Sequence, residues 1–568
     1  MKKKSTEFLA YILIFIVAFY VVLSTSSPIF FAINDDGIIA NIANGRYSGT
    51  PSSDLIFGSK TYGFILSFLY GLFPIVQWHG IYIYVSVFLS CVYLLKELVY
   101  SKSERSTLFA RFGIIILIFN VYLFFLIYPT YTISSLITGF TGVIIFYRNI
   151  LTRSPKYMVP AIFLLNSFII RPDGYLVIIY FLIPGTMYIF IKYRKREKVL
   201  DRNLLIFTPT IIIYLLEQIF KLYSIAQYQE WNDYWNFHNA FSAVTTNPSM
   251  LKMHGAIAGF QISGIKWTNV EATLLHYVVF IDPTIFTSEQ MQRAMNHVKD
   301  YIGISGLINA EISMTFARIW EFMSPVSLIF IALIIVLSVN IILNKTKFYA
   351  YIFIFFTLYV GFLYYYLAAV LRIPPRINVP IIFMIIIGVL FLSLYVKFTS
   401  EKVSIVLILL VGIIVTSFQF QPAGFSGVKS KLLVKQRELI EIDAELNRIN
   451  PNGIFIGDIK YGIESYTDVF SNDYRGKTLD LTSGWHVFSP HWFTKVRSLG
   501  VLDGNPVPLL PYKENAYWVS GDYVGEVMAM YLNDRRYFWQ GKCQVGSLPN
   551  AGLVFSYQIS DKDCQNKN

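Results

Sequence analysis

The chain has 568 residues, of which 55% are hydrophobic and only 14% are charged, and its mean hydropathy is +0.52. Soluble globular proteins carry roughly a quarter charged residues, so this composition excludes an ordinary soluble protein. The formal net charge of +12 would also suit a nucleic-acid-binding protein. Much of the basic charge, however, lies in short segments between apolar runs, as it does in the cytoplasmic loops of membrane proteins. We therefore expect an α-helical polytopic membrane protein that has the lipid bilayer, and no nucleic acid, as a partner.

The N-terminal segment combines a basic start, Met1–Lys4, with an apolar run, Leu9–Leu23. A cleaved signal peptide would begin in the same way, although the small residues that follow form no clear A-x-A site. In either case the lysines stay on the cytoplasmic side, so Asp35 and Asp36 emerge on the far side of the membrane. We expect residues 34–60 to form a polar outer loop there.

Ten further apolar runs predict membrane-spanning helices, for which about 20 residues are needed. The run Tyr62–Phe73 is shorter and is followed by Pro74, so we expect it to form a helix at the outer membrane interface. Together with the first run this gives about eleven spans. The ten are predicted near Trp78–Leu95, Phe112–Tyr128, Ile133–Tyr147, Val159–Ile170, Tyr175–Ile191, Leu204–Phe220, Leu328–Leu343, Tyr349–Leu371, Val379–Val396 and Val403–Phe418.

The basic segments orient the whole chain. Lysine and arginine residues follow alternate spans, which places those segments on the cytoplasmic side. With an odd number of spans, the N-terminus lies inside and the C-terminal part outside. We expect a transmembrane domain over residues 1–420, with outer loops at 25–76 and 224–325. A small extracytoplasmic α/β domain is expected over residues 421–568.

Two patterns in the C-terminal part predict regular structure. Apolar residues at helical spacing predict a helix over Lys429–Asn450, and the apolar stretch within Gly453–Asp458 predicts a buried strand that ends in a turn. Cys543 and Cys564 follow near the C-terminus. If this part lies outside, both cysteines face an oxidising space in which a disulfide between them is favoured.

Three groups of charged residues are predicted at the outer face. Neighbouring carboxylates near a low-dielectric boundary repel one another, which favours a proton on one of them. An acid pair therefore suits a general base or a cation site. Arginine is always charged and grips phosphate with two N–H groups. The three groups are Asp35 with Asp36, Arg171 with Asp173, and Arg372 with Arg376.

Each group also has a purely structural interpretation. Asn, Asp and Gly favour turns, so the first pair suits the start of a solvated loop. The second suits a local ion pair that caps a helix, and the third suits side chains that extend to the membrane interface. The acid pair and a phosphate clamp formed by Arg372 and Arg376 are both predicted at the outer face. Together they favour instead the transfer of a group from a lipid-phosphate donor.

Nucleotide and metal patterns are weak. Gly-rich nucleotide fingerprints are absent from the sequence. His238 and His254 lack an evident third ligand, which argues against a zinc site. His486 and His491 stand beside tryptophans, and an aromatic surface or core fits them better than a metal site does. We expect no cofactor, with a divalent metal as the open alternative.

The order of these features resembles the GT-C glycosyltransferases. In those membrane enzymes the first helix leads to an outer loop with an acidic pair, and an interfacial helix follows. More specifically, the chain resembles bacterial membrane proteins of this type that are found with surface-polysaccharide genes. The resemblance covers most of the chain. The residues that carry it are Asp35-Asp36, Gly45–Pro51, Gly63–Pro74, the turn at Arg372–Arg376 and the stretch Gly484–Pro490.

The resemblance implies an inverting glycosyltransferase in the bacterial cytoplasmic (inner) membrane. The donor would be a polyprenyl-phosphate-linked sugar, and the acceptor a cell-surface glycan or glycolipid on the outer face. The first acid of the pair would be the catalytic base, and the second would orient it. The implied roles are catalysis for Asp35 and Asp36, donor-phosphate binding for Arg372, Arg376 and Arg171, and substrate binding for Asp173.

Three other functions remain as alternatives. A polysaccharide polymerase or ligase also uses outer arginines, but takes a pyrophosphate-linked oligosaccharide. A lipid-linked glycan transporter needs polar residues inside the spans, whereas these spans are almost free of charge apart from Glu217 and Lys221. A glycan sensor would need a sizeable inner domain, and the predicted topology leaves no room for one.

Overall fold

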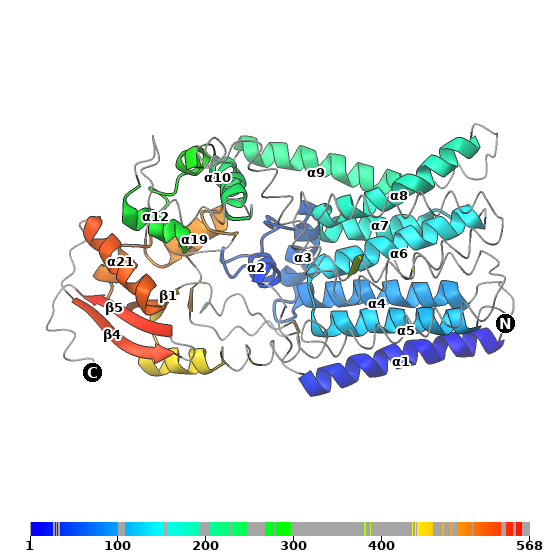
Figure 1. The fold of residues 1–568 in the computed structure, drawn as a ribbon, viewed down its shortest axis with the longest axis horizontal. Coiled ribbons are helices and arrows are strands. Elements are labelled where there is room, and N and C mark those ends of the chain that lie inside the picture. Colours follow the sequence, from blue (N-terminus) through cyan, green and yellow to red (C-terminus); the bar gives the residue numbers. More distant parts are fainter. Residues whose placement is uncertain are drawn as a thin grey trace, which may run out of the picture.

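The computed structural model describes most residues of 2–246, 267–296 and 440–558, with shorter gaps inside these ranges, and isolated positions between 297 and 439. Helices dominate the described part. A bundle of long helices occupies one end, and a mixed sheet with short helices occupies the other (Figure 1). The four predicted spans after residue 327 lie almost entirely outside the described residues.

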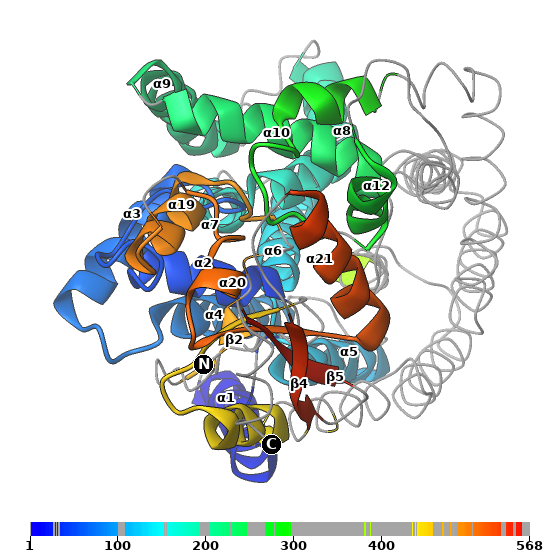
Figure 2. The ribbon, with the colours of Figure 1, turned by 90° about the vertical axis from the view of Figure 1, so that its left-hand side faces the viewer.

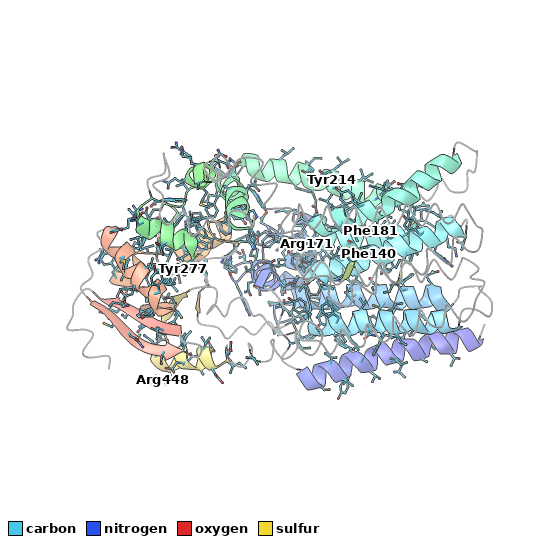
Figure 3. The ribbon with its side chains drawn as sticks, viewed as in Figure 1. Phe140, Arg171, Phe181, Tyr214, Tyr277 and Arg448 are labelled. Atoms are coloured by element: carbon cyan, nitrogen blue, oxygen red, sulfur yellow. The ribbon has the colours of Figure 1, made fainter. Side chains whose placement is uncertain are left out.

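The bundle contains seven of the described helices, each of which includes a predicted span or most of one. α6 packs against α4, α7 and α8, and the rings of Phe140 and Phe181 meet at 4.8 Å between α6 and α8 (Figure 3). The helices run side by side along the long axis of the molecule (Figure 1). They are α1 (Lys2–Ser26), α4 (Trp78–Val99), α5 (Leu108–Ile127), α6 (Tyr131–Leu151), α7 (Met158–Ile170), α8 (Pro172–Tyr193) and α9 (Thr208–Gln227).

Two stretches in the described part are long and apolar enough to cross a membrane, Trp78–Glu97 and Tyr131–Ile150, with mean hydropathies of 1.6 and 1.3. Shorter apolar helical stretches cover Phe8–Val22, Met158–Ile170, Pro172–Ile183 and Leu205–Phe220. The total of eleven spans and the orientation of the termini stay predictions.

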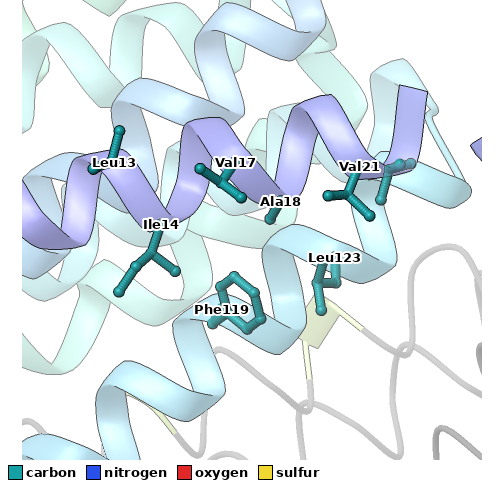
Figure 4. A pocket seen from close by; sticks show the side chains of 8 residues that line it. Leu13, Ile14, Val17, Ala18, Val21, Phe119 and Leu123 are labelled. Atoms are coloured by element: carbon teal, nitrogen blue, oxygen red, sulfur yellow. The ribbon is translucent and has the colours of Figure 1, made fainter. Parts of the chain in front are cut away.

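The outer surface of the bundle is strongly apolar. α1 and α9 expose rows of large aliphatic and aromatic side chains, which water would solvate poorly and which lipid chains would accept. A groove of about 420 Å³ between α1 and α5 is lined entirely by apolar side chains. In it, Phe119 and Leu123 of α5 face Val17 and Val21 of α1 (Figure 4).

α2 (Asn34–Ala43) and α3 (Lys60–Leu72) lie where the bundle meets the rest of the molecule (Figure 1). α3 is found where a short interfacial helix is predicted, and the Ser59 hydroxyl caps its N-terminus by accepting from the Tyr62 backbone N–H. One face of α3 is buried against the protein, whereas Phe64 and Phe68 on another face are exposed. Apolar side chains on both faces suit a helix that lies between protein and lipid.

The C-terminal part forms a five-stranded sheet in the order β2-β1-β3-β5-β4. β1 pairs in parallel with β2 and β3, and β5 pairs antiparallel with β3 and β4. The predicted strand is found as β1. The strands are β1 (Ile454–Gly457), β2 (Thr478–Leu479), β3 (Ala516–Ser520), β4 (Gly541–Leu548) and β5 (Gly552–Gln558).

Both faces of this sheet are covered, which explains why every residue of β3 is buried. Residues 440–449 are helical, as predicted, and their buried side chains pack on the Phe455 and Tyr517 face. The Ile456 and Trp518 face packs on helices from the C-terminal part and on the segment near residues 237–291. α21 and α12 lie together over this end (Figure 2). These helices are α10 (Gln229–Thr246), α12 (Asn269–His276), α19 (Pro490–Ser498), α20 (Leu509–Tyr512) and α21 (Asp522–Asp534).

The cysteines differ in state. Cys91 is buried within α4 with a free thiol. Cys543, in β4, is disulfide-bonded. Its predicted partner Cys564 lies outside the described residues.

Candidate functional site

The acid pair occupies the first turn of α2, and its exposed fractions are 3% for Asp35 and 0% for Asp36. This corrects the prediction of a polar loop for residues 34–43, whereas residues 44–59 are turns and loop as predicted, and burial argues against a solvated loop start. The helix forms because Ile38, Ile39 and Ile42 are buried against the bundle. Acidic side chains in the first turn also interact favourably with the helix dipole.

The chain turns sharply after α2. Gly45 has φ +88°, and a Cβ there would lie 2.4 Å from the carbonyl carbon of Thr50, so only glycine fits this turn. Arg46 folds back onto the helix, where its Nη1 donates to Asn41 Oδ1 at 3.2 Å. The stretch Gly45–Pro51 is therefore a compact extension of α2.

Asp36 is held by residues from two bundle helices. Its Oδ1 lies 3.0 Å from Nε2 of His79, at the start of α4, and accepts the backbone N–H of Tyr131 at 2.7 Å. Tyr131 is the first residue of α6. Backbone N–H groups at a helix start lack partners within their own helix, which makes them good donors to a carboxylate.

His79 is itself fixed by aromatic residues. Its Nδ1 lies 2.8 Å from the Tyr62 hydroxyl, and its backbone N–H donates to the Tyr70 hydroxyl at 3.2 Å. The Phe31 ring lies 5.0 Å from the imidazole, centre to centre. The His79 side chain is 0% exposed, so the acid pair rests on a buried polar group that joins α2, α3 and α4.

Arg171 lies beside this group, at the C-cap of α7 and at the end of the bundle (Figure 3). Its guanidinium is 4.8 Å from the centre of the Tyr131 ring and donates to the Thr132 hydroxyl. Tyr131 and Asp173, and to a smaller extent Asp35 and Asp36, act on it electrostatically. The structure thus brings together three of the predicted site residues.

The remaining predicted residues are placed differently. Asp173 lies in the first turn of α8 with an exposed side chain. Among the described residues, the Arg171 guanidinium bonds to Thr132 rather than to Asp173, so the expected capping ion pair is not formed. Arg372 and Arg376 lie outside the described residues, and their clamp stays a prediction.

A second group of polar and aromatic side chains joins α10 to the stretch near Trp485. The Tyr234 hydroxyl donates to the Trp485 carbonyl at 2.7 Å and lies 3.1 Å from His238 Nδ1. The rings of His238 and Trp485 lie 5.2 Å apart. Burial lowers the pKa of His238 to about 4, so this imidazole is neutral at physiological pH.

The two histidines near Trp485 contact the loop that follows α2. The His486 ring meets the Tyr47 ring at 5.4 Å, and His491 Nε2 donates to the Asp54 carbonyl at 2.8 Å. Burial lowers the pKa of His491. Within the described part, no three His, Cys, Asp or Glu side chains are grouped as metal ligands. The expectation of no metal cofactor stays a prediction.

Sequence reasoning assigned no role to His79 or Tyr62. The sequence does contain one indication, because His79 stands alone at the predicted outer end of an apolar run. This end lies at the depth that is predicted for the acid pair. Such a residue would be costly to bury without a polar partner. Its partner Asp36 stands 43 residues earlier in the chain, a pairing that no local pattern reveals.

No protein-family model matches the chain, and no curated protein sequence matches it either. Two solved structures show a distant likeness. ArnT from Cupriavidus metallidurans in the apo state is 12% identical, with a TM-score of 0.40, over 96% of this chain and 98% of that one. ArnT from the same organism bound to undecaprenyl phosphate is 11% identical, with a TM-score of 0.36, over 96% and 97%.

Proposed function

We propose that the protein is an inverting glycosyltransferase of the bacterial cytoplasmic (inner) membrane. It moves a sugar from a polyprenyl-phosphate carrier to a cell-surface glycan or glycolipid at the outer face. The N-terminus lies inside and the C-terminal domain outside. The observation that carries the proposal is a buried acid pair at the end of an apolar helix bundle, with the Arg171 guanidinium over the ring of Tyr131, whose backbone N–H donates to Asp36.

The acid pair suits the proton transfer in this reaction. Asp36 is held by His79 and by the Tyr131 N–H, so in the proposal Asp35 is the base that meets the acceptor. It takes the proton of the acceptor hydroxyl while that oxygen forms a bond to the anomeric carbon of the donor sugar. The bond from this carbon to the phosphate oxygen breaks on the opposite face, which inverts the configuration.

The leaving group explains the need for a cation. Polyprenyl phosphate gains negative charge as the bond to the sugar breaks, and a preorganised cation stabilises that charge most where water is scarce. The Arg171 guanidinium lies over the ring of Tyr131, whose backbone N–H donates to Asp36. In the proposal Arg372 and Arg376 complete the phosphate site, and Asp173 contacts substrate.

The test is sugar transfer by purified protein from a panel of polyprenyl-phosphate sugars. Asp35→Asn keeps the shape of the side chain and removes the base, so we expect kcat to fall by about 10²–10⁴. Asp36→Asn should lower kcat less, because its role is to orient. Asp233→Asn is the matched control, since Asp233 is an exposed residue of α10 that bonds to Gln229.

Normal turnover by a folded Asp35→Asn variant would show that Asp35 is not the base. If wild-type protein uses only pyrophosphate-linked oligosaccharides, the polymerase or ligase alternative replaces the transferase. If it uses no donor at all, the proposed function is wrong.

A further inference from the structure

A buried chain of hydrogen bonds extends from Asp36 through His79 to Tyr62. The three side chains come from α2, α4 and α3, and each is 0% exposed. His79 uses both ring nitrogens, Nε2 toward Asp36 Oδ1 at 3.0 Å and Nδ1 toward the Tyr62 hydroxyl at 2.8 Å. The proposed transfer reaction assigns no role to His79 or Tyr62.

The donors in this chain follow from the chemistry of the groups. Burial raises the pKa of the Tyr62 phenol well above its usual value, so the phenol keeps its proton and donates to Nδ1. Nε2 then carries the imidazole hydrogen and donates to the carboxylate of Asp36. The Tyr131 backbone N–H donates to the same oxygen. Two donors on Oδ1 favour the charged form of Asp36 and restrict its rotation.

His79 cannot itself serve as the base. Both ring nitrogens of His79 are hydrogen-bonded, and the ring has no exposed surface. The hydroxyl of an acceptor sugar therefore cannot reach a free nitrogen lone pair on this imidazole. Any effect of His79 on the reaction must therefore pass through Asp36.

We propose that His79 is a positioning residue that holds Asp36 charged and oriented beside Asp35, and that Tyr62 fixes the imidazole tautomer. This inference rests on the proposed transferase function. Two like charges in one helical turn repel, so a fixed charge on Asp36 favours movement of the acceptor proton onto Asp35. His79 thus tunes the base without touching substrate.

Two substitutions at position 79 separate this role from packing. In His79→Gln the side-chain amide can take the place of Nε2–H and donate to Asp36. In His79→Asn the shorter amide takes the place of Nδ1, so Asp36 loses the donor from position 79 and keeps the Tyr131 N–H. We expect His79→Gln to retain most of the wild-type kcat and His79→Asn to lower it about 10- to 100-fold, with the acceptor KM little changed.

Tyr62→Phe removes a single oxygen atom and is expected to lower kcat by a smaller factor. The matched control is Tyr84→Phe, which removes a buried hydroxyl that donates to the Leu126 carbonyl at 2.9 Å and leaves the acid pair unchanged. If neither position-79 variant can be purified in folded form, Tyr62→Phe decides the matter. A kcat below that of Tyr84→Phe supports the proposal, and an equal kcat overturns it.

Equal kcat values for His79→Gln and His79→Asn, whether both high or both low, overturn the positioning role. A wild-type protein that is inactive with every donor overturns the proposed function itself. The catalytic role of the contact between His79 and Asp36 is then overturned as well. A double-mutant cycle on thermal unfolding, with His79→Asn and Asp36→Asn, measures the coupling between the two side chains without turnover. Strictly additive effects in that cycle also overturn the proposal.

Discussion

The half-buried histidine of α10 makes the stability of the region around Trp485 depend on pH. His238 has its pKa lowered from 6.5 to about 4, chiefly by burial. An unfolded chain therefore takes up a proton near pH 6.5, whereas the folded protein does so only near pH 4. Between these values the unfolded state holds more protons, so the free energy of unfolding falls as the pH falls. Above pH 6.5 both states are neutral and the effect vanishes.

The size of the effect follows from the shift. Each pKa unit corresponds to about 1.4 kcal/mol, so a shift from 6.5 to about 4 sets a limit of roughly 3 kcal/mol. The ring is partly exposed, and screening by solvent reduces the figure to about 2 kcal/mol. For a local opening of the α10 contact this is a large change.

The assay compares wild type with His238→Asn, whose amide N–H can replace Nδ1–H as the donor to the Tyr234 hydroxyl oxygen, since the Tyr234 hydrogen is already donated to the Trp485 carbonyl. Thermal unfolding in detergent, followed by tryptophan fluorescence, is measured at several values between pH 4 and 7. Trp485 lies against the His238 ring, so the signal reports on this region. The wild type should lose more stability than the variant as the pH falls from 6.5 to 4. Parallel curves for the two proteins would refute the reasoning.

Three further predictions concern other parts of the chain. Without reductant, Cys543 should resist thiol labelling because it is disulfide-bonded. Full labelling would show that this disulfide is absent. Tyr531→Phe should lower the free energy of unfolding by about 1–3 kcal/mol, because the Tyr531 hydroxyl donates to buried Asp282 at 2.7 Å; an unchanged denaturation midpoint would contradict this. Arg376→Lys and Arg372→Ala should each raise the KM for the lipid-phosphate donor, since lysine lacks the planar fork of arginine; donor titrations with unchanged KM would show that these arginines only anchor the chain.

The bundle helices could be predicted because a long apolar run has few alternatives to a membrane or core helix. The starts of α4 and α7 lie within a residue of their predicted positions, at Trp78 and Met158. The sequence around Asp35 and Asp36 instead suggested a turn, since Asn, Asp and Gly favour one. Tertiary contacts override that preference: isoleucines bury one side of α2, while His79 and the Tyr131 N–H hold the acid.

The partners of the acid pair could not be predicted for a related reason. Sequence spacing gave the depth at which Asp35, Asp36 and Arg171 leave the bundle, but depth alone does not say which helices are neighbours. The contact with His79 depends on how α2 and α4 are arranged around α3. Tyr131 contributes a backbone N–H to Asp36 and an aromatic face to Arg171. Almost every residue type has a backbone N–H, so no sequence pattern indicates the first of these contacts.

The core that α10 shares with the C-terminal part has a consequence for biosynthesis. Tyr234 and Trp485, which are hydrogen-bonded, stand 251 residues apart. At roughly 5–20 residues per second, a ribosome needs on the order of 10–50 s to make the intervening chain. During that interval Phe237 and Phe241 of α10 have no Phe488 or Trp485 ring to pack against. The nascent chain therefore exposes an aromatic surface that is prone to aggregation. A protein truncated before residue 485 would expose this surface permanently.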